Sequence, residues 1–134
     1  MSTAVYPDAE LNQEFTDTWK VNNRVLRLFS NNLTITSGTV LANLTEVVGN
    51  GYAAITLTAA SFTLTNLGPG CKCVYALQTF SFTGPAGPIY GYYYTNAGNT
   101  ALYGPIVKFD SPFNILTSAN QIKITPDVRK FGGF

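Results

Sequence analysis

The feature of this sequence that most constrains its fold is a two-residue alternation of apolar with small or polar side chains, which recurs in short segments from residue 24 onward. Residues 52–58, 62–67 and 71–82 show it, and the last of these is long enough for a central strand. Because successive side chains of a strand point to opposite faces, each segment predicts a strand with one buried face. Combinations of Gly, Pro and Asn separate the segments, as in Gly68-Pro69-Gly70 and Gly84-Pro85-Ala86-Gly87-Pro88.

About eight strand-like segments follow one another, with turn signals about ten residues apart, which is typical of a β-sandwich or jelly roll. The sequence therefore predicts an all-β fold, with a β-sandwich domain over residues 24–126. Within it, residues 96–99 predict the turn of a hairpin, Ser111-Pro112 predicts the start of a loop, and residues 121–125 predict the last strand. The alternation also predicts which side chains are buried: Val25, Leu28, Ile55, Leu57, Val74, Ala76, Ile106 and Ile124.

Residues 1–23 and 127–134 lack this alternation, and we expect them to form an N-terminal arm and a C-terminal tail outside the β domain. In the arm, Pro7 suits a helix start, and Leu11, Phe15 and Trp19 recur every four residues, which predicts a short helix with one apolar stripe. Large apolar groups are costly to expose, so we expect both ends to contact neighbouring subunits, with packing against the chain's own core as the alternative. The residues expected at this interface are Tyr6, Leu11, Phe15, Trp19, Phe131 and Phe134.

The side chains that carry enzyme chemistry are scarce. The chain has no histidine, which excludes a Ser-His-Asp or Cys-His arrangement. Outside the arm the carboxylates are Glu46, Asp110 and Asp127, which lie next to turn residues and are expected to be solvated. Cys71 and Cys73 are too few for a metal site, which needs about four ligands, and we expect them to be small buried hydrophobes. We therefore predict no catalytic, metal or cofactor site.

Charge is also scarce. Charged residues make up 11% of the chain, against about 25% in ordinary soluble domains, and the net charge is +1. No basic field is present to attract a polyanion, and no apolar run reaches the roughly 20 residues of a membrane helix, so we expect neither nucleic acid nor membrane as a partner. A weakly charged surface suits a subunit of a larger assembly, and we expect a homo-oligomer, in first place a trimer. The N-terminus lacks a signal peptide's basic start and apolar centre, so we expect folding in a cytoplasm.

The tyrosine cluster is the most suggestive local feature. On a strand, Tyr90, Tyr92 and Tyr94 project to one side and Tyr93 to the other. Aligned aromatic side chains can bind sugars or single-stranded nucleic acid, but they are also common cross-strand partners in any sheet. Because no basic residue is adjacent, we favour packing within the sheet and keep an aromatic binding surface as the alternative.

Several short motifs, in consistent order over about residues 24–126, give the chain a family resemblance. They are Leu26-Arg27-Leu28-Phe29-Ser30-Asn31-Asn32, Leu44-Thr45-Glu46, Gly51-Tyr52-Ala53-Ala54-Ile55-Thr56-Leu57, Leu77-Gln78-Thr79-Phe80, Ile89-Tyr90-Gly91-Tyr92-Tyr93 and Ile122-Lys123-Ile124-Thr125-Pro126. In this order the chain resembles small virion proteins of tailed bacteriophages, a group that includes head decoration, cement and tail-fibre-like proteins. The resemblance implies a β-sandwich or jelly-roll subunit, often trimeric and without enzymatic activity. It assigns no functional residue.

Two functions follow from this resemblance as hypotheses. The first is a capsid decoration or cement protein of the virion, which clamps neighbouring major capsid protein subunits and stabilises the head. The alternative is a tail-fibre or receptor-binding module that contacts host glycan through the tyrosine face. The number of copies in the virion distinguishes them, because a cement protein covers the shell and a fibre does not.

Overall fold

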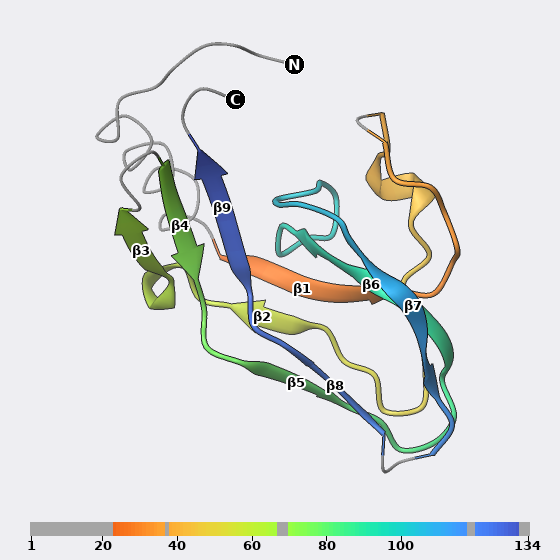
Figure 1. Cartoon of the computed structure of the whole chain (residues 1–134). Helices are drawn as coiled ribbons and strands as arrows, with labels where there is room; N and C mark the ends of the chain where they lie inside the picture. Colours follow the sequence, from red (N-terminus) through yellow and green to blue (C-terminus); the bar gives the residue numbers. More distant parts are fainter. Residues whose placement is uncertain (1–22, 37, 67–69, 118–119, 132–134) are drawn as a thin grey trace. The chain divides into compact units, whose positions relative to one another are not determined.

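The computed structural model describes residues 23–36, 38–66, 70–117 and 120–131 (Figure 1). Over these residues the chain is built from strands, with only two single-turn 3₁₀ helices, and the predicted all-β fold of about eight strands is confirmed. The strands are β1 (Arg24–Phe29), β2 (Ile55–Leu57), β3 (Thr63–Asn66), β4 (Gly70–Val74), β5 (Gln78–Ser81), β6 (Gly87–Thr95), β7 (Val107–Ile115), β8 (Gln121–Ile124) and β9 (Asp127–Phe131). The 3₁₀ helices are η1 (Leu41–Asn43) and η2 (Ala59–Ser61).

The described chain forms two compact units. One contains Asn23, residues 57–77 and the segment from Thr125, with a three-stranded sheet in the order β3-β4-β9. The other, which is the larger unit, contains residues 24–56 and 78–124, with most of a four-stranded sheet in the order β2-β1-β6-β7 and a two-stranded sheet, β5-β8. Residues 24–126 therefore contribute to both units.

Strand β1 is the central element of the larger unit. It pairs with β6 in antiparallel register, so that Leu26 is opposite Tyr94, Leu28 opposite Tyr92 and Phe29 opposite Gly91. Five of its six residues are buried, so the strand is covered on both faces. Burial on both faces explains the apolar run Val-Leu-Arg-Leu-Phe. The charged residue within this run, Arg27, must find a partner.

Glycine is required at one point of this pairing. A Cβ atom on Gly91 would overlap the backbone carbonyl oxygen of Val107 and lie 2.7 Å from two ring atoms of Phe29. Only a residue without a side chain allows β1, β6 and β7 to approach here.

The smaller unit contains the three-stranded antiparallel sheet. In it, Leu64 of β3 is opposite Cys73 of β4, and Cys73 is opposite Val128 of β9. Cys73 is fully buried, in agreement with the expectation of a small buried hydrophobe, whereas the side chain of Cys71 lies outside the described part of the structure. The rings of Phe62 and Tyr75 meet edge to face, with their centroids 4.9 Å apart. The Tyr75 hydroxyl accepts a hydrogen bond from the Thr58 N–H at 3.1 Å, which ties the segment before η2 to the end of β4.

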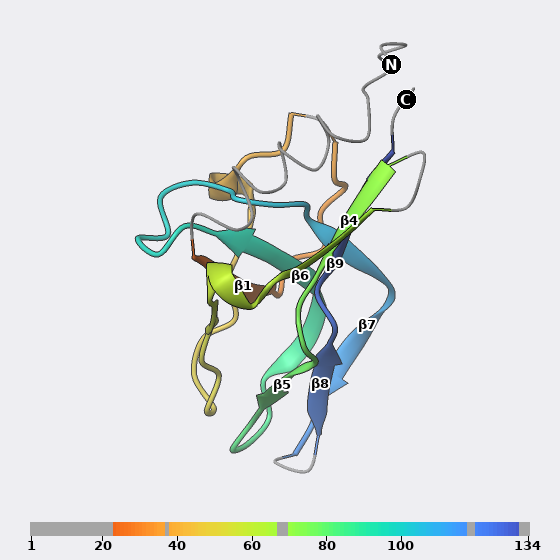
Figure 2. The same cartoon turned by 90° about the vertical axis from the view of Figure 1, so that its left-hand side faces the viewer.

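The predicted single strand over residues 71–82 is wrong, because the segment forms two strands, β4 and β5, with different partners. Strand β4 pairs with β9 and β5 pairs with β8; Figure 2 shows the β5–β8 pair. Three residues (75–77) separate β4 from β5, whereas two (125–126) separate β8 from β9, so a regular ladder cannot continue. Pro126 has no N–H to donate, and its carbonyl oxygen accepts from the Tyr75 N–H at 2.9 Å.

The predicted loop at Ser111-Pro112 is also wrong, because both residues lie within β7. Strand β7 is an edge of its sheet, and its register with β6 shifts between Ile89, opposite Phe113, and Gly91, opposite Lys108. Four residues of β7 therefore face one residue of β6, which is a bulge. Proline is tolerated at both an edge and a bulge because no ladder hydrogen bond is lost there.

The predicted tail is wrong for residues 127–131, which form β9 and pair with β4.

Of the side chains predicted to be buried, Val25, Leu28, Leu57 and Ile124 are buried. Ile55, Val74 and Ile106 are half-buried, and Ala76 is exposed because it lies in the break between β4 and β5, where no strand holds it against a core. Within the described ranges, no helix has the length and apolar character needed to cross a membrane.

Candidate contact loop

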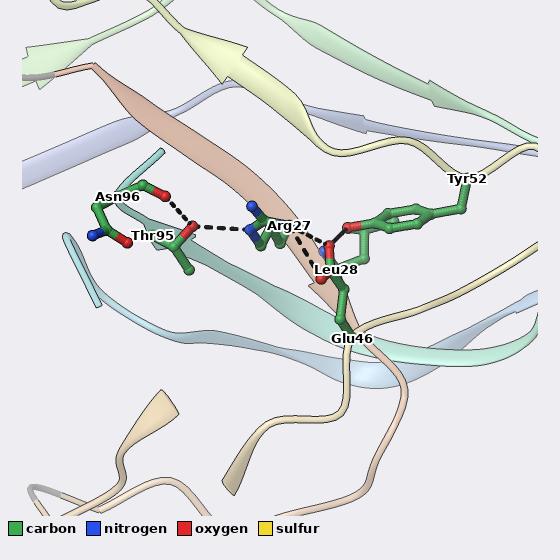
Figure 3. A network of polar contacts seen from close by, with 6 residues as sticks. All are labelled: Arg27, Leu28, Glu46, Tyr52, Thr95 and Asn96. Atoms are coloured by element: carbon green, nitrogen blue, oxygen red, sulfur yellow. Dashed lines mark hydrogen bonds and ion pairs between the residues drawn. The ribbon is translucent and has the colours of Figure 1, made fainter. Parts of the chain in front are cut away.

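A loop at residues 44–52, here called the contact loop, is fixed to the larger unit by the carboxylate of Glu46. One guanidinium nitrogen of Arg27 donates to both carboxylate oxygens, at 2.8 Å to Oε2 and 3.1 Å to Oε1 (Figure 3). The Arg27 Nε also donates to the Thr95 hydroxyl at 2.9 Å, and that hydroxyl donates to the Asn96 carbonyl oxygen at 2.9 Å. The two ionic side chains are only 13% and 23% exposed, so this pair is shielded from most of the solvent.

Tyr52 closes the loop by linking Glu46 to the backbone of β1. Its hydroxyl donates to Glu46 Oε2 at 2.7 Å and accepts from the Leu28 N–H at 3.1 Å. Its ring stacks on Phe80, with centroids 5.9 Å apart and planes inclined by 10°. Burial, together with the neighbouring Glu46 charge, raises the pKa of Tyr52 well above its ordinary value, against the opposing effect of the Leu28 N–H.

Tyr93 lies opposite Arg27 in the β1–β6 ladder and completes the surroundings of the pair. Burial raises the pKa of Tyr93 to about 12, with the Glu46 charge acting in the same direction and the Arg27 charge in the opposite one. Both tyrosines are therefore neutral hydrogen-bonding or packing groups and not acids at neutral pH.

The backbone of the contact loop is held on both sides of its tip. The Val47 N–H donates to the Leu28 carbonyl oxygen at 3.0 Å, and the Val47 side chain is buried. Gly49, Asn50 and Gly51 follow with φ values of 77°, 52° and 82°, a left-handed run in which glycine is favoured. The Asn50 carbonyl oxygen accepts from the Thr83 N–H at 2.8 Å, so the loop is also held on this side.

Val48 projects from this fixed loop into solvent with 81% of its surface exposed, the highest value among the exposed large apolar side chains of the described residues. The others are Leu116, Leu77, Val40 and Phe113. An exposed apolar side chain on a backbone that is held on both sides is suited to contact another molecule.

A hollow of about 420 Å³ lies in the preceding loop, on the same unit. It is lined by Leu33, Thr34, Thr36, Gly38, Thr39 and Asn43. None of these residues is ionisable, so the hollow offers hydroxyl, amide and methyl groups but no acid or base. Asn31 holds its rim, because its side chain accepts from the Thr45 N–H at 2.9 Å and donates to the Asn43 carbonyl oxygen at 2.8 Å.

The sequence prediction that Glu46 is a solvated turn carboxylate is wrong, since the carboxylate is ion-paired and partly buried. Asp110 is exposed on β7, as expected, and Asp127 is exposed at the start of β9. Among the described residues, no three histidine, cysteine or acidic side chains gather where they could hold a metal ion. The carboxylate of Glu46 accepts hydrogen bonds from Arg27 and Tyr52, and these bonds position the contact loop.

Of the predicted site residues, the tyrosine cluster is the part that the structure describes fully. Tyr92 and Tyr94 do share a side of β6, with ring centroids 6.1 Å apart, but Tyr94 is only 1% exposed. Tyr92 also meets the Phe109 ring at 6.0 Å. Tyr90 and Tyr92 are half-buried. Because Tyr94 is buried, it cannot be part of an exposed aromatic surface.

The predicted interface residues at the chain ends are not described. Tyr6, Leu11, Phe15, Trp19 and Phe134 lie outside the described residues, and for Phe131 only the backbone, at the end of β9, is described. Sequence reasoning missed Val48 and the hollow. The signal for Val48 was the doublet Val47-Val48 before Gly49-Asn50-Gly51, since two adjacent apolar residues beside a turn cannot both face one core.

The chain matches no protein-family model, no curated protein and no solved structure.

Proposed function

We propose that this chain is a structural protein of a bacteriophage virion, most specifically a decoration or cement protein that stabilises the head by clamping neighbouring capsid subunits. The observation that carries the proposal is the contact loop: a partly buried ion pair holds the loop in place, and its tip exposes Val48 in a chain with only 11% charged residues. The resemblance to small virion proteins of tailed phages supports the virion as the place of assembly.

Preorganisation of the contact loop would strengthen such a contact. Burying an exposed valine against a partner contributes about 1.5–3 kcal/mol, and little of this is lost when the loop is already ordered. Each contact is modest, but a closed shell carries many copies, and multivalent attachment converts modest contacts into durable ones. We include in the proposal a homotrimeric state and the major capsid protein as partner.

Charge supports the same class of function. Few charges on a subunit surface mean weak repulsion between copies placed side by side. The alternative, a receptor-binding module for host glycan, would use the face of Tyr90, Tyr92 and Tyr94, and the burial of Tyr94 removes one of its three rings. No specific observation favours that alternative.

The test uses binding to phage heads that lack the protein. We expect the purified chain to sediment with such heads, and we expect Val48→Ser to weaken this binding while leaving the melting temperature unchanged. Val40→Ser is the matched control, because Val40 is also exposed but lies outside the contact loop. The proposal would be contradicted if the Val48→Ser and Val40→Ser variants bound heads equally well. It would also be contradicted if the wild-type chain did not bind heads.

A further inference from the structure

The hollow that precedes the contact loop is lined by neutral polar groups. Three threonines and one asparagine supply hydroxyl and amide groups, and Leu33 adds an apolar side chain. Its volume of about 420 Å³ lies within the range of roughly 300–1,000 Å³ that is typical of ligand sites in proteins. The hollow is therefore large enough for a small molecule, and its lining carries no charge.

The polar side chains of the lining are held by hydrogen bonds to the backbone of their own loop. The Thr39 hydroxyl accepts from the Thr36 N–H at 2.9 Å, and the Thr36 hydroxyl accepts from the Gly38 N–H at 3.2 Å. The Asn43 side-chain oxygen accepts from the Val40 N–H at 2.9 Å. Because these groups are already ordered, a ligand that bonds to them loses little free energy in fixing them.

The start of this loop is also tied to strand β7. The Lys108 amine donates to the Asn32 side-chain oxygen at 2.7 Å, one residue before Leu33. This bond fixes the loop and engages the amine outside the lining of the hollow.

The hydrogen bonds within the loop leave donors for a ligand. A hydroxyl that accepts a hydrogen bond keeps its own O–H to donate, and the Asn43 amide keeps its NH₂ group. The Thr34 hydroxyl, also in the lining, has no hydrogen bond to another of the described residues.

The lining selects the class of ligand by its chemistry. An ion would lose hydration without meeting an opposite charge, and an apolar molecule would cover hydroxyl and amide groups without bonding to them. A neutral molecule with many hydroxyl groups incurs neither cost, because its hydroxyls accept and donate hydrogen bonds.

We propose that the hollow binds a neutral saccharide. The hydroxyls of Thr34, Thr36 and Thr39 and the Asn43 amide bond to the hydroxyl groups of the sugar, and Leu33 contacts its C–H groups. The site is separate in sequence from the tyrosine cluster and from the contact loop, and the proposal does not rest on assignment of the chain to a virion.

The experiment follows the backbone amide resonances of the ¹⁵N-labelled full chain by NMR during titration with sugars. The neutral probes are glucose, galactose, mannose, N-acetylglucosamine and the trisaccharide maltotriose, and the charged controls are glucuronate and glucosamine. We expect neutral sugars to bind with Kd values of about 1–10 mM and to shift the amides of Thr34, Thr36, Thr39 and Asn43. Tighter binding of maltotriose than of glucose would identify a glycan chain as the ligand, and equal binding a single sugar.

Two results would overturn the proposal. One is the absence of shifts at these four amides with every neutral probe at about 100 mM, well above the expected Kd. The other is tighter binding of glucuronate or glucosamine than of the neutral sugars, which would show that the hollow selects a charged ligand.

A variant that fills the hollow tests whether the sugar binds there. A Cβ atom on Gly38 would have only the Thr36 hydroxyl oxygen within 4 Å, at 3.8 Å, so Gly38→Leu should keep the wild-type melting temperature. We expect this variant to lose the shifts, whereas Gly98→Leu, the matched control in the hairpin turn, should bind as the wild type does.

A second variant removes one hydrogen bond and preserves the shape of the lining. We expect Thr34→Val, which replaces a hydroxyl by a methyl group, to raise Kd about tenfold. Shifts that persist in both Gly38→Leu and Thr34→Val, or that are lost equally in Gly98→Leu, would place the sugar elsewhere and refute the proposal.

Discussion

Removing the Glu46 carboxylate should destabilise the larger unit by more than an ordinary surface mutation. In Glu46→Ala, the Arg27 side chain, 13% exposed, loses both contacts to the carboxylate and keeps only the Thr95 hydroxyl, and the Tyr52 hydroxyl loses its acceptor. Hydrogen bonds to charged groups contribute about 1.5–3 kcal/mol, and exposed ion pairs about 0–1 kcal/mol. Because this pair is largely but not fully shielded, we expect a loss of about 2–3 kcal/mol.

Urea unfolding followed by circular dichroism measures this loss, and the melting temperature should fall by roughly 10 °C for a chain of this size. The matched control is Asp110→Ala, which removes an exposed carboxylate from β7 and should change the unfolding free energy by no more than about 0.5 kcal/mol. A double-mutant cycle with Arg27→Met isolates the pair, and we expect a coupling energy of at least about 1 kcal/mol. If Glu46→Ala cost no more than Asp110→Ala, or the coupling were zero, the loop would not be held by this pair.

Three further predictions follow from the described contacts. Gly91→Ala should destabilise the chain by about 3 kcal/mol or prevent folding, because its Cβ would overlap a backbone atom. In thermal melts the control Gly98→Ala, whose Cβ would have no neighbour closer than 3.9 Å, should fold normally. Stability should fall as the pH rises through about 10, because Tyr52 and Tyr93 stay protonated in the fold after unfolded tyrosines ionise, and stability that is flat to pH 12 would be inconsistent with their burial. Val48→Ser should leave the unfolding free energy within about 0.5 kcal/mol of wild type, and a larger loss measured in urea would mean that Val48 packs within the subunit.

The all-β class was predictable because alternation and turn residues are local signals. The sequence also indicated the hairpin at residues 96–99, where the Asn96 N–H and the Ala101 carbonyl oxygen are 3.1 Å apart. Strand β9 escaped prediction because Asp-Val-Arg-Lys-Phe is mostly charged, and an edge strand of this kind is stabilised by its distant partner β4 and not by its own pattern.

The contact loop could be predicted only in part. Gly49-Asn50-Gly51 indicated a turn, and the left-handed φ values agree with it. The pairing of Glu46 with Arg27 was not visible, because it depends on an isolated bridge between Phe29 and Glu46 that no local pattern specifies. Arg27, between Leu26 and Leu28 inside β1, was the available signal, since a charge in a strand buried on both faces needs a partner.

The measurement that tests the central claim most directly is a cryo-electron microscopy map of the intact virion at side-chain resolution. We predict many copies of the chain covering the head shell, with Val48 of each copy buried against a neighbouring subunit. Density confined to the tail, absence of the chain from the particle, or a head-bound copy with Val48 facing solvent would contradict it.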